Sequence, residues 1–216
     1  NPKKTAVTDE SGSMTYGELW KDAVRFAAVL QHQGLKRGNI VLVQLPNWRE
    51  YTTIMLGCEL ANIIFAFCPI KWGIRECTRV IKLLRPSLWI TSANYLGEDR
   101  TDLINSSVKN TETNVEIVLL RTDDRDFLSW SELIDQAPSL SETDAVAKAG
   151  SGLDPLEIAV TSGTTGTPKG VIHAHDTVLE TVQSTINRQG ISSKDIIHLA
   201  LPADQENDPV QKNYLF

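Results

Sequence analysis

Apolar residues recur at helical spacing in the stretch TYGELWKDAVRFAAVLQHQG, which runs from Thr15 to Gly34. Five of them would share one face of a helix: Leu19, Ala23, Phe26, Ala27 and Leu30. Thr15 and Glu18 have the spacing of a capping box, and Gly34 suits the left-handed position that follows many helices. The pattern predicts an amphipathic helix that begins after Thr15 and ends before Gly34.

Short apolar runs typical of buried strands alternate with further helical patterns up to Leu120. Strands are expected at NIVLVQL (39–45), IIFAF (63–67), LWIT (88–91) and VEIVLL (115–120). Helices are expected over residues 46–60, capped by Asn47 with Glu50 three residues later, over residues 74–84, stopped before Pro86, and over residues 93–108. This alternation through short links predicts an α/β fold with a mostly parallel sheet flanked by helices on both faces.

The pattern changes after Leu120, where we expect a boundary. RTDDRDF (121–127) predicts a charged loop, and SWSELID (129–135) a short helix with Ser129 and Glu132 at capping spacing. From about Leu156 a second segment repeats the order strand, glycine-rich loop, strand, helix and strand, ending with DIIHLAL (195–201). We therefore expect an N-terminal α/β subdomain over 1–137, a linker over 138–152, and over 153–216 the start of a second α/β subdomain with an incomplete second sheet.

The composition is that of a folded domain, since 41% of the 216 residues are hydrophobic and 22% are charged. A net charge of −6 without a dense basic stripe argues against nucleic acid as a partner. The longest apolar stretch, LANIIFAFCPI (60–70), is too short to cross a bilayer, and no signal-peptide pattern begins the chain, so we expect no membrane span and a cytoplasmic protein. Cys58, Cys68 and Cys77 lie in apolar surroundings without CxxC spacing, which favours buried free thiols.

The stretch TSGTTGTPKGV, from Thr161 to Val171, places five hydroxyl residues, three glycines and one lysine between the apolar runs LEIAV and GVIHA. Glycines let the main chain turn sharply and present successive N–H groups to an anion, while Ser and Thr hydroxyls add further donors. Lys169 adds a positive charge. Because strands are expected on both sides and the composition is not monotonous, we favour a polyphosphate site over a flexible linker.

Two common phosphate-binding loops do not match this stretch. In the Walker A loop a Ser or Thr follows the lysine, whereas here Lys169 follows Pro168 and precedes Gly170. The dinucleotide fingerprint GxGxxG is absent, and the stretch leads into an expected strand where that fingerprint opens a helix.

TSGTTGTPKGV resembles, position by position, the signature of the adenylate-forming (AMP-binding) superfamily, which includes acyl-CoA synthetases, aryl-CoA ligases, luciferases and nonribosomal peptide adenylation domains. MTYGEL (14–19), GLKRGNIVLVQLPN (34–47) and His175 are similar to further features of the family, in the same order. QLPNW (44–48) resembles members that act on aryl or short carboxylic acids. The resemblance covers nearly the whole chain up to Pro202.

The resemblance implies an acid–thiol ligase of the acyl-CoA synthetase type. In such an enzyme a carboxylate attacks the α-phosphorus of ATP, pyrophosphate leaves, and a thiol such as that of CoA takes the acyl group from the acyl-AMP. ATP, Mg²⁺ and CoA are the implied cofactors and co-substrates, and a small-molecule carboxylic acid is the implied substrate. The residues implied in binding the ATP phosphates are Thr161, Ser162, Gly163, Thr164, Thr165, Gly166, Thr167, Lys169 and Gly170.

Later motifs of the family are missing from the sequence: the acidic residue that helps to hold Mg²⁺, the aspartate that binds ribose, the hinge, and the C-terminal lysine that acts in adenylation. After LALP (199–202), Ala203, Asp204 and Gln205 stand where the family commonly has an aromatic or aliphatic pair and a histidine. The chain therefore resembles the N-terminal portion only, with no catalytic residue expected in it, and the fragment alone is expected to be inactive. The alternative is a non-catalytic module, derived from this family, that binds nucleotide phosphates or a partner.

Histidine and aspartate pairs carry weaker signals. His173 and His175 would point to the same side of a strand, but no further ligand lies at metal-site spacing, so we expect no metal site there. Asp123, Asp124 and Asp126 lack the glycine and terminal glutamate of a calcium loop, which favours a solvated loop over a cation site.

The incomplete second sheet should leave unpaired strand edges, through which the chain is expected to self-associate.

Overall fold

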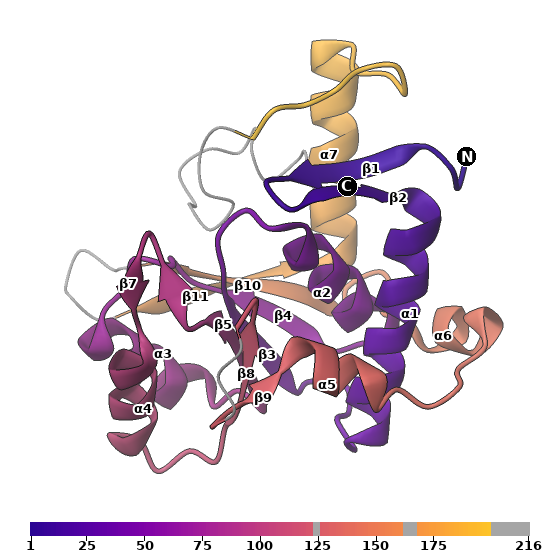
Figure 1. Cartoon of the computed structure of the whole chain (residues 1–216). Coiled ribbons are helices and arrows are strands. Elements are labelled where there is room, and N and C mark those ends of the chain that lie inside the picture. The colour runs from indigo at the N-terminus through magenta and orange to yellow at the C-terminus, as the bar shows by residue number, and fades with distance from the viewer. Residues whose placement is uncertain (123–125, 162–167, 200–216) are drawn as a thin grey trace.

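The computed structural model describes residues 1–122, 126–161 and 168–199, and its centre is a seven-stranded sheet (Figure 1). The strands of this sheet are β3 (Ile40–Gln44), β4 (Ile64–Phe67), β5 (Leu88–Ser92), β8 (Glu116–Leu120), β9 (Leu128–Ser129), β10 (Pro155–Thr161) and β11 (Lys169–Ala174). They lie in the order β11-β10-β4-β3-β5-β8-β9. Neighbours are parallel except β10 and β11, which are antiparallel. The predicted α/β fold with a mostly parallel sheet is confirmed.

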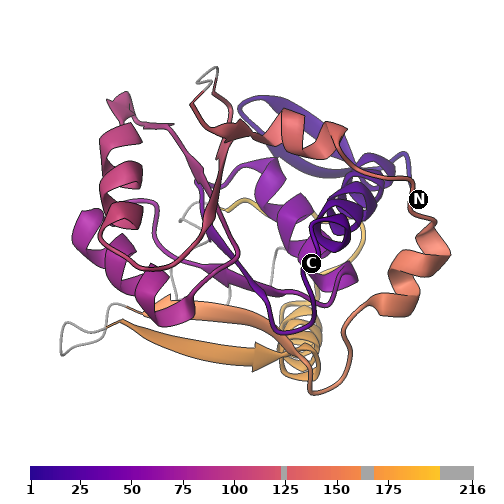
Figure 2. The same cartoon turned by 90° about the horizontal axis from the view of Figure 1, so that it is seen from below.

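Helices cover both faces of this sheet, as the view from below shows (Figure 2). The helices of the described part are α1 (Tyr16–His32), α2 (Arg49–Leu60), α3 (Ile74–Leu84), α4 (Thr101–Lys109), α5 (Trp130–Asp135), α6 (Glu142–Lys148) and α7 (His175–Gln189). Successive residues of a strand point to opposite faces, so Val41 and Val43 join the core beneath α1 and α2. Leu42, between them, joins the core beneath α3 and α4.

Two short antiparallel hairpins lie outside the central sheet, and the sequence pattern predicted neither. One is β1 (Thr5–Asp9) with β2 (Gly12–Thr15), and the other is β6 (Asn94–Tyr95) with β7 (Glu98–Asp99). The helix expected over residues 93–108 is therefore wrong in its first part. Leu96 and Gly97 turn the chain with φ of 51° and 84°, in the left-handed region that interrupts a helix, and α4 begins only at Thr101.

Capping residues were predicted correctly where the cap is local. Thr15 and Glu18 form the capping box of α1, with the Thr15 N–H donating to Glu18 Oε2 at 2.8 Å, and Ser129 and Glu132 form that of α5. The Asn47 cap of α2 is wrong, because Trp48 is the N-cap residue and makes no side-chain capping bond.

Two segments after β9 and α5 show local structure that the sequence pattern did not indicate, or lack a strand that it did. The connection at 138–152 contains the short helix α6, whose first turn is capped by the Ser141 hydroxyl accepting from the Asp144 N–H at 3.1 Å. Residues 195–199, expected to begin a strand, form no regular element in the described part, and the remainder of DIIHLAL lies outside it.

The strands β10 and β11 do not belong to a second sheet. Glu157, Ile158 and Ala159 of β10 pair in parallel with residues 65–67 of β4, so the hairpin extends the first sheet beyond β4. The reason lies in the side chains: Ile158 and Val160 fit the core beneath α3 and α4, and Ala159 fits the core on the other face. Pairing also covers the edge that β4 would otherwise expose. The domain boundaries at 137 and 153 stay a prediction.

The three cysteines are free and buried, as the sequence indicated: Cys58, Cys68 and Cys77. Burial raises the pKa of the Cys77 thiol to about 11, which keeps it protonated at neutral pH. Within the described ranges, no helix has the length and apolar character needed to span a membrane.

Candidate functional site

The β10–β11 hairpin brings together the two ends of the hydroxyl- and glycine-rich stretch. Thr161, the last residue of β10, pairs with Lys169, the first residue of β11, and the Thr161 hydroxyl donates to the Lys169 carbonyl oxygen at 3.4 Å. Thr161 is half-buried and Lys169 is exposed. The predicted site residues between them lie outside the described residues: Ser162, Gly163, Thr164, Thr165, Gly166 and Thr167.

The position of this hairpin end in the sheet is one at which α/β proteins bind ligands. Because β10 runs parallel to β4, Thr161 lies at the same edge as the carboxyl ends of β3, β4, β5 and β8. Open parallel sheets bind ligands in the crevice outside those ends. Among the residues that the structure describes, none forms an ion pair with Lys169.

Gly170 has a packing role that the sequence did not indicate. A Cβ at this position would lie 2.8 Å from Ile158 Cγ2 on the neighbouring strand and 3.8 Å from Leu84 Cδ2 of α3. Gly170 therefore allows β11 to lie close against β10. Its predicted contact with phosphate stays a prediction.

A buried polar cluster lies at the carboxyl ends of β3 and β5. The Gln44 amide Nε2 donates to the Pro69 carbonyl at 2.9 Å, and the Thr91 hydroxyl donates to the Gln44 carbonyl at 3.0 Å. Arg100, 5% exposed, donates from Nη1 to Thr91 Oγ1 at 3.2 Å and to the Ser92 carbonyl at 3.3 Å. Burial lowers the pKa of Arg100, but these neutral acceptors still solvate one edge of its guanidinium. Polar residues at the ends of apolar strands were the only sequence signal for this cluster.

A charged network, also missed from the sequence, joins the N-terminal hairpin to the carboxyl end of β8. Arg121 Nη2 bonds to Asp9 and lies 2.7 Å from Glu50 Oε2, and its guanidinium lies 4.2 Å from the centre of the Trp48 ring. The Asp9 carboxylate also accepts the backbone N–H of Arg49 at 3.0 Å, which satisfies the first donor of α2. Burial would raise the pKa of Asp9, yet the bonds from Arg49 and Arg121 hold it below its usual value.

The two histidines near the hairpin do not form the pair that a single strand would give. His173 lies in β11, whereas His175 begins α7 and is buried against Glu59 of α2, with Nδ1 3.5 Å from Oε1. Burial raises the pKa of Glu59, and the nearby imidazole opposes that shift.

No group of three or more His, Cys, Asp or Glu residues in the described ranges has a geometry that holds a metal ion. The residues that the structure describes thus offer no ligand set for the Mg²⁺ implied by the family resemblance.

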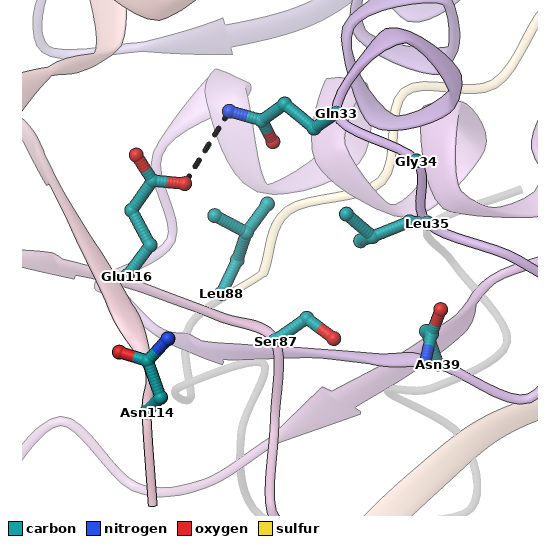
Figure 3. A pocket seen from close by; sticks show the side chains of 8 residues that line it. All are labelled: Gln33, Gly34, Leu35, Asn39, Ser87, Leu88, Asn114 and Glu116. Carbon is teal, nitrogen blue, oxygen red and sulfur yellow. Dashed lines mark hydrogen bonds between the residues drawn. The ribbon is translucent and has the colours of Figure 1, made fainter.

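A separate polar pocket of about 620 Å³ lies at the opposite edge of the sheet, by the amino ends of β3, β5 and β8 (Figure 3). It is lined by Gln33, Gly34, Leu35, Asn39, Ser87, Leu88, Asn114 and Glu116. Gln33 reaches across it, with Nε2 donating to Glu116 Oε2 at 3.3 Å, as the dashed line in Figure 3 marks. This pocket therefore does not adjoin the end of the hairpin that bears Thr161 and Lys169.

Comparison with known proteins identifies a matching family. Residues 1–204 match the family described as AMP-binding enzyme. The chain is 33% identical over 183 residues to acetyl-coenzyme A synthetase of Shewanella oneidensis, covering 76% of this chain and 27% of that protein. It is 29% identical over 178 residues to the 3-[(3aS,4S,7aS)-7a-methyl-1,5-dioxo-octahydro-1H-inden-4-yl]propanoyl:CoA ligase of Rhodococcus jostii, covering 79% of this chain and 34% of that protein. The chain spans about a third or less of the length of these curated relatives.

The fold has close counterparts among solved structures. The apo structure of MbtA from Mycobacterium smegmatis superposes with a TM-score of 0.81 over 99% of this chain and 39% of the other, at 24% sequence identity. At that identity the likeness shows a shared fold.

Proposed function

Because the chain belongs to the AMP-binding enzymes, the adenylate-forming superfamily, we propose that it is the N-terminal portion of an ATP-dependent acid–thiol ligase of the acyl-CoA synthetase type. Its relatives include acetyl-CoA synthetases, and the chain aligns with only part of their length. A small carboxylic acid is then the substrate, with ATP and CoA as co-substrates.

The reaction has two steps. A carboxylate oxygen of the acid attacks the α-phosphorus of ATP, the bond to the bridging oxygen of the β-phosphate breaks, and pyrophosphate leaves. The thiol sulfur then attacks the acyl carbon, AMP leaves, and the thiol proton passes to solvent. Charge grows on the departing pyrophosphate in the first transition state, so N–H donors, hydroxyls and an ammonium already directed there lower the barrier.

In this proposal residues 161–167, Lys169 and Gly170 bind the β- and γ-phosphates, and Lys169 contributes the positive charge. The single observation that supports it best is the pairing of Thr161 with Lys169 at the carboxyl edge of the parallel strands. That pairing holds both ends of a loop rich in glycine and hydroxyl residues at the edge where ligands of such sheets bind. Main-chain N–H groups of such a loop make an anion site without any catalytic side chain.

The chain alone is proposed to lack adenylation activity, since the motifs for ribose, Mg²⁺ and the adenylation lysine do not occur in its sequence. Carboxylate-dependent exchange of labelled pyrophosphate into ATP tests this with the purified 216-residue chain, using acetate and benzoate as probe acids. We expect no exchange above the protein-free control. Exchange at the rate of an intact ligase would contradict the proposal.

Phosphate binding is tested separately with Lys169→Ala, measuring the dissociation constant of ATP by titration followed in NMR spectra. Loss of a charge-assisted hydrogen bond of about 1.5–3 kcal/mol corresponds to weakening by roughly ten- to a hundredfold. The matched control is Lys82→Ala, an exposed lysine of α3, which should bind ATP as the unaltered chain does. Equal affinity of the Lys169→Ala and Lys82→Ala chains would rule out the role of Lys169.

The alternative is a non-catalytic module, derived from the same family, that binds nucleotide phosphates or a partner. A module that binds nucleotide phosphates would bind ATP without exchange, as the ligase fragment would. The gene sequence downstream of the codon for Phe216 separates them, because an open frame with the later motifs supports the ligase and a stop codon supports the module.

A further inference from the structure

The hairpin that presents Thr161 and Lys169 is held at its opposite end by a buried histidine. His175 follows the last residue of β11 and is 4% exposed. Its Nδ1 lies 3.5 Å from Oε1 of Glu59, near the C-terminal end of α2. Its backbone N–H donates to the carbonyl of Asp154, immediately before β10, at 3.2 Å. One residue thus joins the end of β11 to a core helix and to the beginning of its partner strand.

The backbone on the other side of the imidazole leaves the ring little freedom. A Cβ at Gly150 would lie 2.5 Å from Nε2 of His175 and 3.0 Å from Oδ1 of Asn62. The Gly150 N–H donates to the backbone carbonyl of Glu59 at 3.2 Å, which holds this segment against α2. The Glu59 side chain therefore holds the imidazole, and the Glu59 carbonyl holds the backbone segment that covers the ring.

The register of β11 depends on contacts such as those of His175. Within the described part of the sheet, β11 is an edge strand that pairs only with β10, and this pairing is irregular between Pro155 and Glu157, close to His175. A slip by one residue turns every side chain of a strand to the opposite face. Such a slip would also replace Gly170 by Val171 or Lys169 beside Ile158, where no Cβ fits.

We propose that His175 is a positioning residue for Lys169: its imidazole, held between Glu59 and Gly150, fixes the register of β11 and thereby the place of the Lys169 ammonium. The effect on nucleotide rests on the proposed function of Lys169. The effect on the register of β11 does not, so the two are measured separately.

Amide hydrogen exchange, followed residue by residue by NMR, tests the register. In His175→Ala and in Glu59→Ala we expect the amides of β11 to exchange at least about tenfold faster, with β3 amides unchanged, since local opening needs less free energy than global unfolding. Glu59→Gln keeps the volume and an oxygen near the imidazole and should retain most of the protection. His32→Ala, an exposed histidine of α1, is the matched control.

If His175→Ala destabilises the whole chain, Gly150→Ala provides a second test, because it keeps both partners and displaces the imidazole, which is the nearest group to the new methyl, ahead of Asn62. It should raise exchange in β11 and leave β3 protected. The proposal would be overturned if amide exchange in β11 stayed unchanged in His175→Ala, Glu59→Ala and Gly150→Ala. It would also be overturned if Glu59→Gln lost as much amide protection in β11 as Glu59→Ala.

ATP affinity tests the consequence for Lys169. If His175 acts through Lys169, His175→Ala should weaken ATP binding, and adding Lys169→Ala should cause little further loss, since the two residues then form one coupled unit. Fully additive losses would show that His175 does not act through Lys169. If the unaltered chain binds no ATP, the proposed function fails, while the exchange data still decide whether His175 fixes the register.

Discussion

The central strand β3 and the edge strand β11 have similar lengths, five and six residues, but opposite surroundings. Val41, Leu42 and Val43 are at most 1% exposed because helices cover both faces of the sheet at β3. Val171 and Ile172 of β11 are 43% and 62% exposed. The helix that follows β11 adds little cover, as α7 buries only His175 and Val182.

This contrast separates the part of the molecule that supplies stability from the part proposed to bind nucleotide. Ligand-binding segments belong to the less stable regions of proteins, because they must open and close without unfolding the core. In this chain the central strands can form a rigid support, while β10 and β11 present their loop from the edge. Each of the following predictions compares a change in one region with a change in the other.

The largest effect is expected in the core, for Phe26→Ala. Phe26 is fully buried in α1, packs closely against Gly57 of α2, and lies 5.0 Å from the Trp130 ring. Its removal should cost about 3–5 kcal/mol of unfolding free energy, whereas Val171→Ala on β11 should cost less than about 1 kcal/mol. Urea unfolding measures the unfolding free energy of both variants. Equal losses for Phe26→Ala and Val171→Ala would contradict the difference in stability between the core and β11.

Asp9→Asn tests the charged network that holds the N-terminal hairpin to the core. Its side chain is 3% exposed and bonds to Arg121, so the neutral residue should cost about 1.5–3 kcal/mol at pH 6–7. Because the pKa of Asp9 is below 3.8 in the folded chain, its contribution is present above that value and disappears as pH falls through the folded pKa. The difference in unfolding free energy between the two chains should therefore shrink at acid pH.

Glu10→Gln is the control for that experiment, since Glu10 bonds to the same arginine but its side chain is 72% exposed. Exposed ion pairs contribute about 0–1 kcal/mol. The role given to Asp9 would be contradicted if Glu10→Gln lowered the unfolding free energy as much as Asp9→Asn. It would also be contradicted if the loss for Asp9→Asn did not depend on pH.

Gly170→Ala should loosen the hairpin without unfolding the core. The new methyl group meets Ile158 at 2.8 Å, and overpacking of this kind costs about 1–3 kcal/mol. Faster amide exchange is expected in β11 and not in β3. Combining the change with Ile158→Leu, which removes the methyl branch at Cβ that carries the clash, should restore part of the protection, and no restoration would argue against a steric cause.

The smallest effect on stability is expected for Ile172→Lys, which instead tests self-association. A lysine on an exposed edge strand opposes pairing with another chain. If the chain associates through β11, sedimentation velocity should show dimers or larger species that Ile172→Lys reduces, with unfolding free energy changed by less than about 0.5 kcal/mol. Val146→Lys on α6, also at an exposed apolar residue, should leave association unchanged. Equal association of all three chains would exclude the β11 edge.

Sequence patterns predicted the elements whose determinants are local. Thr15 with Glu18 and Ser129 with Glu132 cap their own helices, so spacing along the chain was sufficient. The beginning of α2 could not be predicted in this way, because its first N–H is satisfied by Asp9, forty residues earlier in the chain. Leu96 takes a left-handed conformation that its residue type disfavours, so the β6–β7 hairpin gave no clear signal.

The candidate site was predicted through its composition rather than through its contacts. The glycines, hydroxyls and Lys169 indicated an anion site, and the flanking strands indicated that both ends would be held. Sequence alone gave no means of seeing that Gly170 faces Ile158 or that His175 reaches Glu59, since these contacts join segments far apart in the chain or across two strands.

The pairing of β10 with β4 also has a consequence for the order in which the chain folds. Phe65 pairs with Glu157, about 90 residues later, and at about 5–20 residues per second a ribosome needs roughly 5–20 seconds to make the intervening segment. During that time β4 can pair with β3 on one side only, and its other edge, with Phe65 and Phe67, has no partner strand. An open apolar edge in a nascent chain invites pairing with the wrong strand. Synthesis of β10 therefore ends the interval in which this edge of β4 is open to wrong pairing.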